Sequence, residues 1–582
     1  MFDKNQKKTR IIFGVVLFIY AAYYSGRGID VSDTTYALGN YQYMDKLDSM
    51  WMIATYISNI FGRLIISLPG AGTLYGAYVY ATCLFAVFVT SVYVVLSRYI
   101  NPFLVFIAEI VAAGLFWCPK VIFYNCLTYY LMAAAILMLI YGLKNDRYRY
   151  LVIAGVILGF NVFVRFSNAI ECLLIIGVWF YEIAEHHKPS ELIKKTISCI
   201  AGYIAGFVIP LIFVGVQYDL DTYFDMIDSL FGMTQTAKDY GSNGVFRAVR
   251  YQVLDTFTDM KYLIFIAVIF AVVSILIHRL FESKDQIAAR LGTAVKVCNV
   301  ILLCALCLYF FKKGIYTTAY YEYSSIFKCA NMFIILAFVC NLINVTGLLK
   351  STVIFRTLSL MCLVQMIIAP MGTNNHMYAI MGNLFITAPV TFAIIYNVCR
   401  KLKDRVYGFA IASVCVYIAV IALVQSFAFH MSFSYVDGRD GSSLDTKVNS
   451  ISRLGGLYTI KDRAEDLDGL YTYISDNGLT DHKVMYFGQD TAGLAYIMDM
   501  EPAINTLWPD LDSYTVSKYE KALDGLKLED DALIIMSTNL TYGSNVDTKK
   551  QMLEEFITDN SYSKIYENDM YTLYSNVGRY TP

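Results

Sequence analysis

The chain has 582 residues, of which 57% are hydrophobic and 16% charged, and its mean hydropathy is +0.50. Soluble proteins of this length are far more polar, so the composition excludes a soluble globular protein and indicates an integral membrane protein. The formal net charge is −1, yet the stretch from Met431 onward holds 25 acidic and 13 basic residues, a net charge of −12. This split predicts a domain boundary that separates 1–430 from 431–582.

Apolar segments that can cross a bilayer recur up to residue 430 and number thirteen. In chain order they are 11–24, 74–97, 102–117, 127–143, 150–165, 169–183, 196–217, 261–278, 294–311, 329–347, 353–370, 381–398 and 407–429. The predicted fold class is therefore a polytopic α-helical membrane protein with about 13 transmembrane helices.

Lysine and arginine gather in alternate loops, beginning with the N-terminal stretch before Ile11. The positive-inside rule then places the N-terminus in the cytoplasm, and thirteen crossings place the acidic tail outside. The apolar run after the N-terminus lacks a small-residue cleavage pattern, which predicts an uncleaved signal anchor. The tail contains no cysteine, which suits the bacterial plasma membrane with an extracytoplasmic tail.

The first loop, from about Ser25 to Thr73, lies outside in this topology. Its stretch 50–68 has apolar residues at helical spacing and ends at Pro69, which predicts a helix lying in the outer interface. The alternative is a tilted or re-entrant crossing, which would reverse the orientation of everything after it and spoil the charge pattern.

The tail from Met431 is predicted to be a soluble α/β domain in which helices alternate with strands. Helices are expected over 462–477 and 549–557, strands over 483–488 and 532–536, and an edge strand over 571–574. A loop over 502–514, rich in Trp, Pro and Asp, either docks the tail onto the membrane domain or forms part of an acceptor platform, and docking is favoured.

Asp30 and Asp33 are the candidate catalytic residues, because they follow the first crossing directly and lie between Arg27 and Tyr36. Spaced three residues apart, they would share one face of a helical turn. A carboxylate at a membrane surface can deprotonate an acceptor hydroxyl or hold a divalent cation. The plainer interpretation is a pair of solvated loop aspartates.

A first crossing, an external loop with an acidic pair just ahead of Tyr36-Ala37-Leu38, and interfacial helices resemble the GT-C superfamily of membrane glycosyltransferases. Its members include protein O-mannosyltransferases, aminoarabinose transferases and oligosaccharyltransferases. The layout of the whole chain is similar, while the specific likeness is confined to the first loop. The resemblance implies that Asp33, with Asp30 as its partner, acts as base or metal ligand, although the adjacent Asp-Glu pair of several members is lacking.

What the resemblance implies is transfer of a sugar, a hexose or a pentose, from a polyprenyl-phosphate donor to a cell-envelope glycan, lipid or protein. The alternative to a base role is that Asp30 and Asp33 hold a divalent cation, Mg or Mn. Such transfer needs positive charge for the departing phosphate. Residues expected to bind substrate are Arg27, Tyr36, Arg63, Arg165, Lys312, Lys313, Glu322, Asn374 and Asn375. Arg165 can equally be an arginine that reaches for the interface, and Asn374-Asn375 a tight turn. Asn125 is interpreted as a helix N-cap.

The alternative function is a transporter or flippase of lipid-linked sugars without chemistry of its own, and a third is an adhesion or signalling protein. Transporters concentrate polar groups at mid-membrane, whereas here the polar residues gather at the outer face. No phosphate-binding glycine loop, nicotinamide fingerprint or HExxH motif is present. Membrane lipids are expected partners, and the acidic tail argues against nucleic acid.

Overall fold

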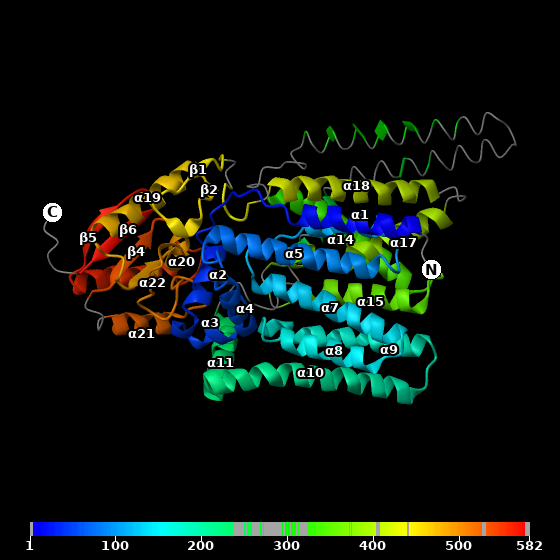
Figure 1. Ribbon diagram of the computed structural model, residues 1–582, viewed down its shortest axis with the longest axis horizontal. Helices are drawn as coiled ribbons and strands as arrows, with labels where there is room; N and C mark the ends of the chain where they lie inside the picture. The colour runs from blue at the N-terminus through cyan, green and yellow to red at the C-terminus, as the bar shows by residue number, and fades with distance from the viewer. Residues whose placement is uncertain are drawn as a thin grey trace.

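The computed structural model describes residues 4–236, 323–371, 373, 375–402, 408–432, 434–438, 442–526 and 531–576, with scattered positions between 249 and 312. Most of the first part is a bundle of helices (Figure 1). The long elements of the bundle are α1 (Lys4–Ala21), α5 (Leu74–Leu96), α6 (Pro102–Gly114), α7 (Tyr124–Lys144), α8 (Tyr148–Asn161), α9 (Ile175–Ala184), α10 (Pro189–Gln217), α14 (Tyr323–Val345), α15 (Val353–Ile368), α17 (Thr387–Lys401) and α18 (Gly408–Ser432).

Helix occurs at each predicted crossing outside 261–311, the range of the eighth and ninth segments, which lie largely outside the described residues. Within the described residues, five helices are long and apolar enough to cross a membrane. One of them begins as the 3-10 helix η2 (Phe166–Leu174) and continues as α9. Many apolar side chains of the bundle are exposed, as expected where lipid rather than water is the surrounding solvent.

Helices α8 and α10 pack closely through small residues on both sides. A Cβ atom on Gly202 or Gly206 would lie 2.1 Å from a backbone carbonyl of α8, and one on Gly155 or Gly159 would lie 2.2 or 2.1 Å from a carbonyl of α10. Each helix therefore presents two glycines four residues apart to the other, the spacing with which membrane helices bring their backbones together.

The loop between α1 and α5 folds into short helices at one end of the bundle (Figure 1). These are α2 (Asp33–Gln42), η1 (Met44–Lys46), α3 (Ser49–Ile53) and α4 (Tyr56–Ile66). At 11 residues, α4 is about 16 Å long, too short to cross about 30 Å of hydrocarbon. It exposes Ile60 and Leu64 and buries Ser58 and Asn59 against the protein, as a helix at the membrane surface would. The helix predicted over 50–68 is divided into α3 and α4, and its place in the outer interface stays a prediction.

The tail contains a four-stranded mixed sheet in the order β3-β4-β6-β5, formed by β3 (Val484–Phe487), β4 (Leu533–Ser537), β5 (Ser563–Glu567) and β6 (Tyr571–Ser575). Strands β3 and β4 are parallel, and the other pairs are antiparallel. The prediction of an edge strand over 571–574 is wrong, because β6 pairs on both sides. The expectation missed β5, whose charged hairpin sequence has weak strand character.

The remaining elements of the tail surround the sheet or face the first loop. The helices are α19 (Lys461–Asp476), α20 (Leu494–Met498), α21 (Val516–Leu526) and α22 (Val546–Asp559), with the 3-10 turns η4 (Ser452–Leu454) and η5 (Gln489–Thr491) and a small antiparallel pair β1 (Thr446–Lys447) and β2 (Tyr458–Thr459). Helix α11 (Leu220–Thr236), after the seventh crossing, lies at the same end, since Ser229 accepts a hydrogen bond from Lys518 of the tail.

Candidate functional site

The backbone of Ile29, directly before Asp30, is held by a buried ion pair of the tail. The Asp437 carboxylate accepts the Ile29 N–H at 2.7 Å, and the Arg463 guanidinium donates to the Ile29 carbonyl at 3.1 Å. The two side chains also bond to each other at 2.6 Å, and Thr459 donates to the second oxygen of Asp437. Burial raises the pKa of Asp437, while Arg463 acts to lower it. We call Asp437 and Arg463 the clamp.

Backbone contacts on both sides of the clamp tie the same stretch to the tail. The Gly28 N–H donates to the carbonyl of Tyr458 at 2.7 Å, and the Gly493 N–H donates to the carbonyl of Val31 at 2.9 Å. Gly28 has a φ of +99°, and a Cβ there would lie 1.7 Å from the Ser434 hydroxyl. A side chain at residue 28 would therefore break both the turn and the contact.

Asp30 is buried and its carboxylate is used within the loop. One oxygen accepts the N–H and the hydroxyl of Ser32, at 2.9 and 2.6 Å, and the other accepts the N–H of Thr34 at 2.7 Å. The carboxylate thus satisfies N–H groups at the beginning of α2. Asp30 lies before the helix, so the prediction that it shares a helical face with Asp33 is wrong: the chain turns between them.

Asp33 is the first residue of α2 and is half-buried. Its carboxylate accepts a hydrogen bond from the Tyr435 hydroxyl at 3.0 Å. An aromatic row continues from Tyr435, whose ring lies 5.5 Å from that of Trp117, which in turn lies 4.9 Å from Tyr378. Tyr378 stacks on Phe327 at 4.1 Å. The first loop and the stretch after α18 therefore meet at Asp33, and the stretch after α6 joins them through the contact of Trp117 with Tyr435.

The stretch between α6 and α7 also carries a basic residue to this end of the bundle. Lys120 lies three residues after Trp117, and the same stretch anchors α2, because the Tyr41 hydroxyl donates to the carbonyl of Ile122. Desolvation lowers the pKa of the Lys120 ammonium to about 8. It is therefore a cation at neutral pH that loses its charge in mildly alkaline solution.

Arg165, directly before η2, lies over the ring of Tyr124 at 5.4 Å and donates to the side-chain oxygen of Asn125 at 3.2 Å. The prediction that Asn125 is an N-cap is wrong, because Phe123 takes the cap position of α7 and Asn125 already lies within the helix. Asn125 orients the guanidinium instead. Lys120 lies four residues before α7, and Arg165 bonds within the first turn of the same helix.

Three further residues of the first loop were expected to bind substrate. The Arg27 side chain is exposed, and its carbonyl accepts a hydrogen bond from Tyr24 at 3.3 Å. Tyr36 lies with its ring 5.3 Å from Trp508 of the tail. Arg63 forms an exposed ion pair with Asp45 at 2.7 Å. Their roles in binding substrate stay predictions, and all three belong to the first loop.

The other expected residues lie in later segments. Lys312 is an exposed helical position. The backbone N–H of Asn375 donates to the Thr373 hydroxyl, and its carbonyl accepts from Tyr378, as in a turn. Outside the described residues lie Lys313, Glu322 and Asn374.

The divalent cation expected between Asp30 and Asp33 does not fit the pair as it stands. The carboxylate of Asp30 already accepts three hydrogen bonds and is 1% exposed, so its oxygens face the loop and not a shared site. In the described part of the chain no three His, Cys, Asp or Glu side chains gather in a way that could hold a metal.

The loop over 502–514 docks the tail, which was the favoured interpretation. Trp508 packs on Tyr36, and the carbonyl of Asn505 accepts the N–H of Asp48 in the first loop at 2.8 Å. Buried Lys549 supports this loop from behind by donating to the carbonyls of Pro509 and Leu511 at 2.9 and 2.7 Å, and to that of Tyr514.

Sequence reasoning missed Tyr435, Asp437, Arg463 and Trp117 as members of the site. A signal existed for the first two, which come directly after the last crossing, just as the acidic loop comes after the first. Helices α1 and α18 are neighbours (Figure 1), and His430 of α18 bonds to the carbonyl of Tyr20 of α1 at 2.7 Å. No spacing in the sequence pointed to Arg463.

No family model and no curated protein matches the chain. Among solved structures, the oligosaccharyltransferase of Archaeoglobus fulgidus in complex with Zn and sulfate is similar over 97% of this chain and 73% of that one, at 12% identity and a TM-score of 0.46. The same enzyme tethered to an acceptor peptide containing the NVT sequon covers 91% and 69%, again at 12% and 0.46. Apo ArnT from Cupriavidus metallidurans covers 98% and 97%, at 10% identity and a TM-score of 0.39.

The likeness to the GT-C superfamily therefore stays a resemblance stated from the sequence. At these identities and TM-scores, the activity has to be argued from the residues of this chain.

Proposed function

We propose that the chain is a membrane glycosyltransferase that moves a sugar from a polyprenyl-phosphate donor to a cell-envelope acceptor, on the outer side of a bacterial plasma membrane. The observation that carries the proposal is the half-buried Asp33 carboxylate, which faces the Tyr435 hydroxyl at 3.0 Å where the first loop, the tail and the ends of the helices meet. A half-buried carboxylate held by a second polar group suits a general base.

In the proposed reaction, an acceptor hydroxyl attacks the anomeric carbon of the donor sugar. The new bond joins the acceptor oxygen to that carbon, while the bond from the carbon to the phosphate oxygen breaks. Asp33 takes the hydroxyl proton, and the polyprenyl phosphate leaves with the electron pair. The anomeric centre becomes cation-like on the way, as in glycoside hydrolysis.

The departing phosphate gains negative charge, which a nearby cation stabilises. Lys120 and Arg165 are the proposed partners, because Lys120 lies four residues before α7 and Arg165 bonds to Asn125 in the first turn of α7. Asn125 and Tyr124 fix the Arg165 guanidinium in one orientation. The proposed steps are carried by these side chains, and none is routed through a metal.

Asp30 is proposed as a positioning residue. Its three accepted hydrogen bonds hold the turn that leads into α2, and so aim Asp33 at the site. The expected hexosyl or pentosyl specificity, and binding by Arg27, Tyr36, Arg63, Lys312, Lys313, Glu322, Asn374 and Asn375, remain part of the proposal.

The test uses the purified chain in liposomes with radiolabelled polyprenyl-phosphate sugars and a cell-envelope extract as acceptor. Asp33→Asn is expected to lower transfer at least about 100-fold, because it removes the base. Asp462→Asn is the matched control, an exposed aspartate in the first turn of α19, and is expected to transfer at the wild-type rate. Wild-type transfer by a folded Asp33→Asn protein would refute the assignment.

The same liposomes separate the enzyme from a flippase of lipid-linked sugars. If labelled donor changes leaflet while no label reaches the acceptor, the transport function replaces the proposed one.

A further inference from the structure

A large cavity lies at the end of the bundle remote from the tail. Its volume is about 540 Å³, and it lies where α5, α7, α14 and α17 end and α6 and α15 begin. Arg10, near the start of α1, bonds to Ser97 and to the carbonyl of Val94, which places this end beside the N-terminal side of the chain. The first loop and the tail contact the start of α5, for Tyr496 bonds to the carbonyl of Gly72.

The walls of the cavity divide into an apolar part and a basic part. The apolar part is formed by the side chains of Leu96, Leu104, Leu137, Ile140, Phe355 and Leu358. Four basic residues line the cavity as well, Lys144, Lys350, Arg400 and Lys401, and all are exposed. None of the described residues that line the cavity is acidic.

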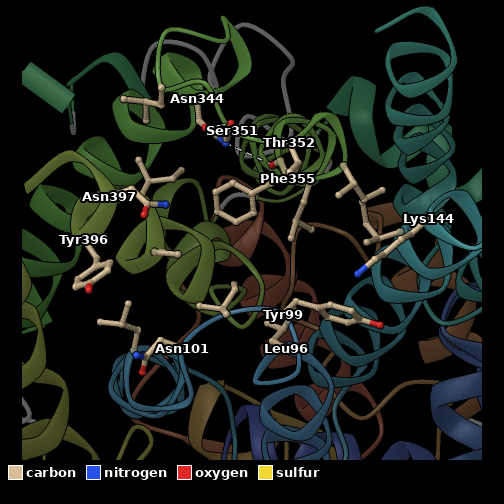
Figure 2. Close-up of a pocket in the computed structure, with 18 of the residues that line it drawn as sticks. Leu96, Tyr99, Asn101, Lys144, Asn344, Ser351, Thr352, Phe355, Tyr396 and Asn397 are labelled. Carbon is tan, nitrogen blue, oxygen red and sulfur yellow. Dashed lines mark hydrogen bonds between the residues drawn. The ribbon is translucent and has the colours of Figure 1, made fainter. Parts of the chain in front are cut away.

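The polar groups of the cavity are held in place by neighbours. Lys144 lies with its ammonium 3.9 Å from the centre of the Tyr99 ring, and Figure 2 shows these two side chains together on one side of the cavity, with Asn397 on the other. The Ser351 hydroxyl donates to Asn344 at 2.6 Å, at the start of the turn into α15. Lys401 donates to the carbonyl of Leu349. The basic rim is therefore built from both sides of the cavity.

We propose that this cavity binds an anionic phospholipid of the surrounding membrane. Its phosphodiester headgroup would lie among Lys144, Arg400 and Lys401, and one acyl chain would cover the partly exposed Leu104, Leu137 and Phe355. Basic residues at one end of a membrane protein are common and by themselves indicate orientation alone. Here they border a cavity of ligand-binding size with an apolar wall, which is the pattern of an intramembrane headgroup site.

The shape of the site favours a phospholipid over a free anion. Inorganic phosphate or a nucleotide would satisfy the cations and leave the leucine-lined wall uncovered. The site also spans a seam, since α5, α6 and α7 line one side and α14, α15 and α17 the other. A lipid bound there would hold the two sets of helices together, and its effect is predicted to be on stability, not on the chemistry at Asp33.

The test is native mass spectrometry of the full chain released from nanodiscs of phosphatidylcholine with one fifth phosphatidylglycerol. Wild-type protein is expected to retain one phosphatidylglycerol, and the triple variant Lys144→Gln, Arg400→Gln, Lys401→Gln to retain at least tenfold less. The matched control removes three exposed cations outside the cavity: Arg147→Gln, Lys188→Gln and Lys194→Gln. It is expected to retain the lipid as the wild type does.

A second variant, Ala393→Trp, fills the cavity and keeps all its cations, because Ala393 lines the wall. It too is expected to lose the lipid, while both cavity variants melt as the wild type does in pure phosphatidylcholine. The proposal would be overturned if the cavity triple and the control triple lost the lipid equally, or if Ala393→Trp retained it. It would also be overturned if the site captured added inorganic phosphate or polyprenyl-phosphate sugar in place of phospholipid. A loss of lipid retention with sugar transfer intact separates this site from the proposed function.

Discussion

Replacing Arg463 by Met is predicted to release the first loop from the tail. The change keeps most of the side-chain volume and removes the cation that bonds to Asp437 at 2.6 Å. Asp437 is 0% exposed, so its charge would be left in a region without water. Breaking one partner out of a buried ion pair costs about 3–5 kcal/mol. The carbonyl of Ile29 also loses its hydrogen-bond donor, and the cost of that loss is included in the range of about 3–5 kcal/mol.

The double variant Arg463→Met, Asp437→Asn separates the pair from its surroundings. Asparagine still accepts from Ile29 and Thr459 but carries no charge, so the double variant is expected to lose less than the sum of the single losses by at least about 2 kcal/mol. The matched control is Lys461→Met on the same helix, which breaks only an exposed pair with Glu465 and should cost less than about 1 kcal/mol.

The assay is chemical unfolding in mixed micelles followed by tryptophan fluorescence. The chain has four tryptophans, and Trp51, Trp117 and Trp508 all lie around the first loop, so the signal reports on this junction. Midpoints convert to free-energy differences when the slopes agree. If Arg463→Met unfolds at the midpoint of Lys461→Met, or if the single losses simply add, the clamp does not hold the loop.

Two other outcomes follow from single contacts. Gly206→Leu should destabilise the chain by about 3 kcal/mol or more, because its Cβ would lie 2.1 Å from the Val156 carbonyl. Gly525→Ala serves as the control, because there is open space around its Cβ. Equal melting temperatures for the two variants would contradict the close packing of α8 and α10. Sugar transfer should fall as the pH rises through about 8, because Lys120, whose pKa is lowered to about 8, then loses its charge. Lys120→Arg keeps the charge and should keep transfer at higher pH. If the pH profile of Lys120→Arg equals that of the wild type, Lys120 does not belong to the phosphate site.

The sequence predicted the elements well where one physical signal dominates. Apolar runs located the helices outside 261–311, since hydrophobic length alone decides a crossing. The strand over 483–488 was predicted from its buried apolar residues, and the helix over 462–477 from the glycine that follows its last turn. Strand β5 was missed, because its pairing with β6 and not its own composition makes it a strand.

The site was predicted in part, because its members come from distant segments. Position after the first crossing singled out Asp30 and Asp33, yet nothing local showed that one is buried and the other half-exposed. That difference depends on Ser32 and Thr34 closing around Asp30, and on Tyr435 meeting Asp33 from 402 residues away. Hydropathy and spacing carry no information about such pairings.

The contacts around Asp30 make the loop and the tail one unit. Ile29 is gripped by the clamp, Gly28 and Val31 bond to backbone groups of the tail, and the Asp33 carboxylate bonds to the hydroxyl of Tyr435. The catalytic geometry proposed for Asp33 thus depends on segments near the C-terminal end of the sequence. Loss of the clamp should therefore reduce sugar transfer as strongly as it reduces stability, even though neither clamp residue is proposed to contact the sugar.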